Sequence, residues 1–214
     1  MNKNRCFIVG AGEFSCRVLP SKHDYIIAAD GGYSELIARG ITPDIVIGDF
    51  DSLGHVPEHP NIAQYQADKD DTDMMLAVKH GLAKGCSIFV IDGGLGGRLD
   101  HTLANIQILA HIAQSGARGY LIGRDICVTA VKDGAVRFAP GLSSRISVFC
   151  AGDKAEGVML DGLKYPLDGA TLTCDYPVGV SNEFTGAPAT VAVRSGTLII
   201  TWAGGLETID LDGI

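Results

Sequence analysis

Short apolar runs alternate with stretches of helical periodicity from residue 5 to about residue 122. We expect buried strands at 6–9, 25–29, 44–47, 62–66, 87–91 and 119–122. The spacing of apolar residues predicts one helix from about Thr72 and another over 99–114, with shorter helices after Glu13 and Tyr33. Strands that alternate with helices are typical of βαβ units and a mostly parallel sheet. The first part of the chain is therefore predicted to be a three-layer α/β domain.

The pattern changes after residue 123. Short strand-like runs at 125–131, 135–138, 145–150, 170–174, 190–194 and 197–202 are separated by Asp-Gly, Pro-Gly and Ser-Gly turn signals. Many short strands of this kind predict an all-β sandwich. We place the domain boundary near residue 124, which gives an α/β domain over 1–124 and a β-sandwich domain over 125–214.

Composition restricts the classes of protein that fit. A chain of 214 residues with 46% hydrophobic content can bury its own core, and no apolar run approaches the roughly 20 residues of a membrane span. Gly10 also interrupts the only apolar segment near the start, so we expect a cytoplasmic protein without a signal peptide. The six cysteines are scattered without a C-x-x-C pair, which favours reduced core thiols over zinc or disulfides.

The net charge of −8, with no cluster of Lys or Arg, argues against a nucleic-acid partner. A small ligand is the better expectation. An acidic protein that handles a polyphosphate needs metal cations between its carboxylates and the phosphates. This requirement directs attention to the aspartates.

Four acidic or glycine-rich turns follow the predicted strands: Asp30-Gly31-Gly32, Gly48 to Ser52, Lys69 to Asp73, and Asp92 to His101. In open parallel sheets, ligands bind beyond the carboxyl ends of the strands. The four turns are therefore expected to contribute to one site.

Asp49 and Asp51 are two positions apart, and an extended backbone would turn both carboxylates the same way while Phe50 faces the core. Two like charges at close range are costly unless a cation lies between them. A solvated Asp-rich turn is the alternative.

In the next turn, Asp71 or Thr72 could cap the following helix. Three aspartates and a lysine exceed that need, so we expect Asp73 to face a ligand and Lys69 to supply a charge for phosphate.

The segment from Asp92 to His101 combines glycines, a helix N-terminus and Arg98. Free backbone N–H groups suit a phosphate there, and Arg98 can hold it through two hydrogen bonds. A tight corner is the alternative role for the glycines. His101 is interpreted as a structural hydrogen-bond partner, since no second histidine lies nearby in the sequence.

Other nucleotide-binding motifs fit less well. No G-x-x-x-x-G-K-[ST] sequence occurs. Gly10-x-Gly12 followed by Asp30 resembles a dinucleotide fingerprint, but Ser15 replaces its third glycine. A nicotinamide oxidoreductase would also have no use for so many clustered aspartates. That enzyme and a non-catalytic nucleotide sensor remain as alternatives.

Taken in order, the blocks ADGG, PDIVIGDFDS, KDDTD and GGRLDH, with Asn105 following, resemble the thiamine pyrophosphokinase family. The blocks from Gly162 to Leu167 and at Ser181-Asn182 are similar to its C-terminal motifs, so the resemblance spans about residues 28 to 202. It implies transfer of the β,γ-diphosphate of ATP to the hydroxyl of thiamine, with AMP as the second product. It further implies an ATP- and Mg²⁺-binding domain over 1–124, a thiamine-binding domain over 125–214, and a homodimer with active sites between subunits.

The resemblance also implies roles for individual residues. Asp49, Asp51 and Asp73 would hold Mg²⁺; Asp30 and Asp100 would complete the acidic site; Lys69 and Arg98 would clamp phosphates; Asp70, Thr72 and Asn105 would contribute to ATP binding; and Ser181 and Asn182 would help to hold thiamine. Asp49, Asp51, Asp73, Asp100 and Arg98 form the expected catalytic set. Either Asp100 or Asp73 could accept the hydroxyl proton, and the sequence leaves that choice open. Asp71 is left out of the site.

Overall fold

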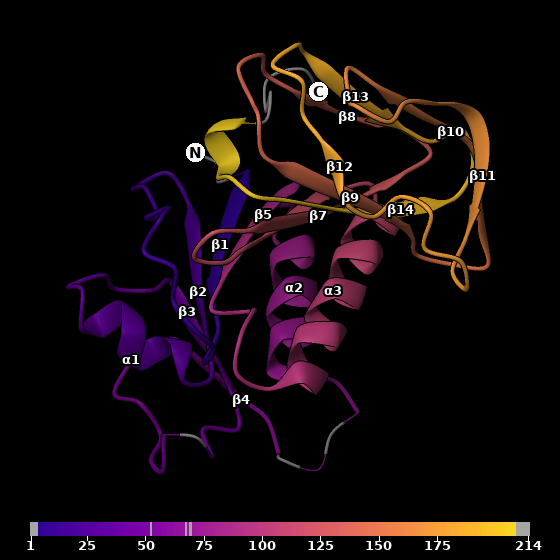
Figure 1. The fold of residues 1–214 in the computed structure, drawn as a ribbon. Coiled ribbons are helices and arrows are strands. Elements are labelled where there is room, and N and C mark those ends of the chain that lie inside the picture. The colour runs from indigo at the N-terminus through magenta and orange to yellow at the C-terminus, as the bar shows by residue number, and fades with distance from the viewer. Residues whose placement is uncertain (1–3, 52, 67, 69, 209–214) are drawn as a thin grey trace. The chain divides into compact units, whose positions relative to one another are not determined.

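The computed structural model describes residues 4–51, 53–66, 68 and 70–208. The protein is a mixed α/β chain with a large sheet and a second sheet that is antiparallel throughout (Figure 1). It forms two compact units. The first runs to Ile108 and adds Gly119–Arg124, and the second contains Leu109–Arg118 and the described chain from Asp125 onward. The boundary placed near residue 124 stays a prediction.

The strands of the first unit follow the apolar runs of the sequence. They are β1 (Arg5–Val9), β2 (Tyr25–Ala29), β3 (Ile45–Gly48), β4 (Ile62–Gln64), β5 (Ile88–Asp92) and β6 (Arg118–Ile122), in the spatial order β6-β5-β1-β2-β3-β4. The pairs β5–β1, β1–β2, β2–β3 and β3–β4 are parallel. Strands β1, β3 and β5 are almost entirely buried. Apart from Arg5 and Asp92 at their ends, they carry the continuous apolar runs that are typical of parallel strands covered on both faces.

Three helices accompany these strands: α1 (Gly32–Ile37), α2 (Asp73–Ala83) and α3 (Leu99–Gln114). Thr72 caps the start of helix α2, and its hydroxyl accepts a hydrogen bond from the Met75 N–H at 3.2 Å. Helix α1 starts against the end of β1, where a Cβ atom at Gly32 would collide with the Val9 carbonyl oxygen. The geometry at the start of α1 therefore requires glycine.

The short helix expected after Glu13 is not formed, so that prediction is wrong. Cys16 has a φ of 58°, outside the helical region. The N–H of Ser15 donates to the Asp92 carboxylate at 2.8 Å instead of to a helical carbonyl. This connection between β1 and β2 is held by a side chain of β5, which the local sequence does not reveal.

The second unit contains two antiparallel groups of strands. One has the order β12-β9-β14-β7, formed by β12 (Asn182–Glu183), β9 (Arg145–Cys150), β14 (Thr197–Trp202) and β7 (Cys127–Lys132). The other has the order β11-β10-β13-β8, formed by β11 (Leu167–Thr173), β10 (Lys154–Asp161), β13 (Ala189–Ala192) and β8 (Ala135–Phe138). A 3₁₀ turn, η1 (Leu206–Thr208), follows β14. The antiparallel β content agrees with the prediction, and the sandwich layering remains a prediction.

Strand β10 was missed by the sequence pattern. Its pairing with β11 shifts register on either side of Val158, and Gly157 has a φ of 66°. These irregularities are typical of a β-bulge, which interrupts the alternation of apolar and polar residues that identifies a strand. In the core of this unit, Trp202 is 1% exposed, packs edge-to-face on Phe138 and donates from Nε1 to Thr208 at 2.9 Å.

Two other expectations concern cysteines and membranes. Cys6, Cys86 and Cys127 are buried, as expected for core thiols, but Cys16 and Cys174 are exposed, so the core interpretation is wrong for these two. Among the described residues, no helix combines the length and the apolar character that crossing a bilayer requires.

Candidate active site

A cavity of about 390 Å³ opens at the carboxyl ends of the parallel strands of the first unit. Glycine and alanine make up nine of its sixteen lining residues. It is lined by Gly10, Ala11, Gly12, Ala29, Asp30, Thr72, Asp73, Met74, Gly93, Gly94, Gly96, Gly97, Arg98, His101, Ala104 and Asn105. Three of the four turns singled out in the sequence contribute to this wall, which agrees with the rule for open parallel sheets.

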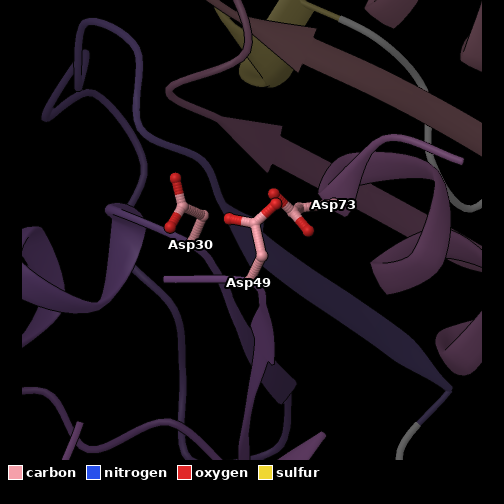
Figure 2. Close-up of side chains that lie close together, drawn as sticks. All are labelled: Asp30, Asp49 and Asp73. Carbon is pink, nitrogen blue, oxygen red and sulfur yellow. The ribbon is translucent and has the colours of Figure 1, made fainter. Parts of the chain in front are cut away.

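Three aspartates gather beside this cavity. Asp30 follows β2, Asp49 follows β3, and Asp73 is the first residue of α2. Each offers one carboxylate oxygen within 4.8 Å of those of the other two, and Figure 2 shows the three side chains projecting from separate segments into the same space. All three are partly buried, so their mutual repulsion is only incompletely screened by water.

A divalent cation fits this group. Oδ1 of Asp30 is buried and has no hydrogen-bond partner among the residues that the structure describes. A buried carboxylate oxygen without a donor is costly, and an oxygen-binding cation removes that cost. Asp30 also has a φ of 49°, a conformation that is uncommon outside glycine and concentrates at functional sites.

The expected alignment of Asp49 with Asp51 is wrong. Phe50, between them, is 2% exposed and faces the core as expected, but its φ of 66° turns the backbone, which is therefore not extended. Asp51 is exposed, and its N–H donates to Oδ1 of Asp49 at 3.2 Å. Asp30 takes the third place in the carboxylate group, and the assignment of Asp51 as a metal ligand stays a prediction.

Arg98, which lines the cavity, forms an exposed ion pair with Asp100. Nη2 of Arg98 lies 2.6 Å from Oδ2 of Asp100, and Nε lies 3.2 Å from Oδ1. The hydrogen bonds from Arg98 lower the pKa of Asp100, which makes this carboxylate a weak proton acceptor while the pair is intact. Arg98 must release Asp100 before its full fork can face a phosphate.

The remaining predicted nucleotide contacts are distributed unevenly. Thr72 and Asn105 both line the cavity. Asn105 is buried, and its Nδ2 donates to the Gly94 carbonyl at 2.7 Å, which fixes part of the glycine-rich turn. Asp70 is exposed and does not line the cavity, and Lys69 lies outside the described residues. Asp71, left out of the predicted site, pairs with Lys79 at 2.6 Å.

Ser181 and Asn182 belong to the second unit. The Asn182 side chain is buried, accepts from the N–H groups of Tyr165 and Glu183, and donates to the Tyr165 carbonyl at 2.7 Å. This pattern anchors the loop that carries Tyr165. Ser181 is exposed with a φ of 60°, and its N–H donates to Ser147. Their roles in binding remain predictions.

Several cavity residues were missed by sequence reasoning. Gly10, Ala11 and Gly12 form part of the wall, although the sequence raised this segment only as a dinucleotide motif. Its position directly after the first strand was the signal that could have placed it in the site. Met74 and Ala104 also line the cavity, and apolar helical residues of this kind carry no such signal.

Comparison with known proteins gives consistent matches. The family model described as "Thiamin pyrophosphokinase, catalytic domain" matches residues 16–121, and "Thiamin pyrophosphokinase, vitamin B1 binding domain" matches residues 137–198. A thiamine pyrophosphokinase of Bacillus subtilis is 31% identical over 186 residues, which cover 84% of this chain and 87% of that protein. Thiamin pyrophosphokinase 1 of Caenorhabditis elegans is 27% identical over 77% of this chain and 73% of its own length.

The solved structures agree with the sequence matches. The crystal structure of thiamine pyrophosphokinase from Bacillus subtilis superposes with a TM-score of 0.80 at 29% identity and covers 94% of this chain and 100% of that one. The similarity therefore extends over both units of the chain.

Proposed function

The chain belongs to the thiamine pyrophosphokinase family, and we propose that it transfers the β,γ-diphosphate of ATP to the hydroxyl of thiamine in the cavity beside Asp30, Asp49 and Asp73. The products are thiamine diphosphate and AMP. The observation that carries this proposal is the pairing of a glycine-walled cavity with three converging carboxylates. The first feature suits a polyphosphate, and the second suits the cation that must accompany it.

The chain's own carboxylates would hold Mg²⁺. Asp30, Asp49 and Asp73 supply the oxygen donors that this ion prefers, and the buried Oδ1 of Asp30 accounts for why a cation is needed there. When bound, Mg²⁺ neutralises charge on the phosphate oxygens. Asp51 stays a proposed ligand on the strength of the sequence resemblance.

Side chains at the mouth of the cavity would orient the nucleotide. Arg98 lines the cavity and would contact phosphate oxygens as negative charge moves onto the departing AMP. Thr72 and Asn105 face the same space, and Asp70 and Lys69 are proposed to contribute from the preceding segment. Either Asp73 or Asp100 is proposed to accept the thiamine hydroxyl proton, and Asp100 would first have to lose the hydrogen bonds from Arg98 that lower its pKa.

Ser181 and Asn182 are proposed to help bind thiamine. The protein is proposed to be a cytoplasmic homodimer with active sites at the subunit interface. The permanent positive charge of thiamine suits a site rich in carboxylates. Exposed apolar side chains beside the cavity support a subunit contact. Leu99 and Leu103, one turn apart on α3, are 71% and 55% exposed, and a partner subunit that covered them would remove this apolar surface from water.

The test is an AMP-forming assay with purified protein, thiamine, ATP and Mg²⁺, from which each component is omitted in turn. We expect AMP and thiamine diphosphate in equal amounts only in the complete mixture. AMP that forms without thiamine, or no AMP at all, would contradict the proposal. Sedimentation velocity, with Leu103→Arg as the disrupting variant, tests the homodimer separately.

A further inference from the structure

Two glycine loops form the cavity wall by direct backbone contact. One follows β1 at Gly10–Gly12, and the other follows β5 at Gly93–Gly97. The N–H of Gly12 donates to the Gly93 carbonyl at 2.8 Å, and a Cβ atom added at Gly12 would lie 2.5 Å from that oxygen. No side chain can stand between the loops. Their spacing is therefore set by whatever holds their ends.

The carboxylate of Asp92 holds both loops. Asp92 ends β5, pairs with Val9 of β1 and is 0% exposed. Its Oδ1 accepts from the N–H of Ser15 at 2.8 Å and from the N–H of Gly93 at 2.7 Å. Its Oδ2 accepts from the hydroxyl of Ser15 at 2.7 Å. One side chain thus joins Ser15, which follows the first loop in the chain, to Gly93, the first residue of the second loop.

This arrangement maintains a buried charge that would otherwise be unfavourable. Burial raises the pKa of Asp92, while the hydrogen bonds from Ser15 and Gly93 oppose the rise. A buried carboxylate is destabilising unless donors surround it. The principal donors are Gly93 of the second loop and Ser15 on the segment that continues from the first loop, so this carboxylate ties the two loops together.

We propose that Asp92, acting through Ser15 and Gly93, is a positioning residue for the polyphosphate of ATP. Asp92 does not line the cavity itself. It fixes the spacing of the two loops whose residues line the cavity. The inference rests on the proposed function, because that function makes ATP the occupant of the cavity.

The hydrogen bonds of Asp92 allow its effect on loop geometry to be separated from the effect of its charge. All three bonds use Asp92 as an acceptor. In Asp92→Asn, the amide oxygen can accept hydrogen bonds from both backbone N–H groups. The amide nitrogen can donate to the Ser15 hydroxyl oxygen, which then acts as an acceptor instead of a donor. Asparagine therefore keeps all three contacts without the charge. Alanine keeps none.

The test compares Asp92→Ala and Asp92→Asn with Asp24→Ala. Asp24 is a matched control: it is 2% exposed and accepts hydrogen bonds from Arg5 at 2.6 and 2.8 Å, but it does not line the cavity. We expect Asp92→Ala to raise the KM for ATP about tenfold, with the KM for thiamine changed less than twofold. Asp92→Asn should stay within twofold of the wild type for both. Asp24→Ala should lower Tm without changing the KM for ATP.

Other outcomes would overturn the inference. An unchanged KM for ATP in Asp92→Ala would leave Asp92 a purely structural residue. An equal defect in Asp92→Asn would mean that its charge acts, not the geometry it imposes. If Asp92→Ala does not fold, Ser15→Ala, which removes the bond to Oδ2 of Asp92 and the 3.3 Å bond that the hydroxyl accepts from the N–H of Arg17, should raise the KM for ATP two- to threefold. An unchanged value in Ser15→Ala would count against the inference.

Equilibrium binding separates this test from that of the proposed function. Calorimetric titration with ATP, without thiamine, should show the same order of affinities: wild type and Asp92→Asn alike, and Asp92→Ala about tenfold weaker. A wild type that binds ATP but makes no thiamine diphosphate would refute the proposed function and leave the role of Asp92 measurable. A wild type and Asp92→Ala of equal ATP affinity would refute the role of Asp92 alone.

Discussion

Replacing Asp30 by asparagine removes one of three negative charges from the carboxylate group and keeps the shape of the side chain. Asp30 follows β2, and its Oδ1 is buried without a hydrogen-bond partner among the described residues. The substitution therefore acts on the electrostatics of the group more than on packing. It should change the stability of the protein in opposite directions without and with Mg²⁺.

The magnitude follows from the separation of the carboxylates. Two unit charges at the limiting distance of 4.8 Å repel by roughly 0.9 kcal/mol in water and roughly 3.5 kcal/mol at an effective dielectric constant of about 20. Asp30 has two such neighbours, Asp49 and Asp73. Because all three are only partly buried, the lower figure is the better guide. Asp30→Asn should raise the free energy of unfolding of the metal-free protein by about 2 kcal/mol, equivalent to roughly 4–8 °C in Tm.

Mg²⁺ reverses the order of stabilities. The variant attracts a divalent ion with one negative charge fewer, so its affinity for Mg²⁺ should be at least about tenfold lower than that of the wild type. Saturating Mg²⁺ should therefore stabilise the wild type more than the variant. Turnover should fall by about a hundredfold or more. The assay is thermal unfolding as a function of Mg²⁺ concentration, run beside steady-state kinetics.

Asp71→Asn is the matched control, since Asp71 lies close in sequence to Asp73 but pairs with Lys79 outside the group. It should leave the Mg²⁺ response unchanged. A metal-free Asp30→Asn protein of lower Tm, with an unchanged Mg²⁺ midpoint, would refute the reasoning. Asp51→Asn completes the series: a loss of the Mg²⁺ response as large as that of Asp30→Asn would support Asp51 as a ligand.

Three further predictions concern single features of the chain. Arg98→Lys keeps the charge and loses the planar fork, so the KM for ATP should rise about tenfold while the KM for thiamine stays within twofold; a defect confined to thiamine would show that the role is misassigned. Ser181→Ala with Asn182→Ala should raise the KM for thiamine several-fold with little change for ATP, and the single Ser181→Ala variant should retain the wild-type Tm, because only Asn182 anchors a loop; an unchanged KM for thiamine in the double variant would contradict the binding role. Burial raises the pKa of Asp24, but hydrogen bonds from Arg5 and Ser21 outweigh it and lower the pKa overall. Its stabilisation is therefore present above its unfolded pKa of about 3.9 and lost as the pH falls through the folded value. Asp24→Asn should cost about 2 kcal/mol at pH 7, and chemical denaturation at pH 7 and pH 3 should show the difference from wild type shrinking in acid.

Local pattern was sufficient for much of the fold. The apolar runs of β1, β3 and β5 and the helical spacing of α2 and α3 identify these elements because each has a regular period that burial imposes. The helix expected after Glu13 failed for the opposite reason. The conformation of that segment is fixed by Asp92, 77 residues away from Ser15, and a contact of that separation leaves no trace in the local pattern.

In the candidate site, too, some residues follow from the local sequence and others depend on contacts between distant segments. Asp49 and Asp73 follow from their motifs, since both lie directly beyond or at the start of a regular element. The place of Asp30 in the carboxylate group depends on two left-handed residues, Asp30 and Phe50. Neither is glycine, so sequence alone gave no reason to expect those conformations. Gly10 and Gly12 were visible in the sequence, but their role depends on contact with Gly93 across β1 and β5.

The most direct test of the central claim follows the phosphorus atoms of ATP. The protein is incubated with thiamine, Mg²⁺ and ATP labelled at either the α- or the β-phosphorus, and the products are separated. The account predicts that the α label is recovered in AMP and the β label in thiamine diphosphate. Recovery of the β label in ADP, with thiamine monophosphate as the other product, would contradict transfer of a diphosphate.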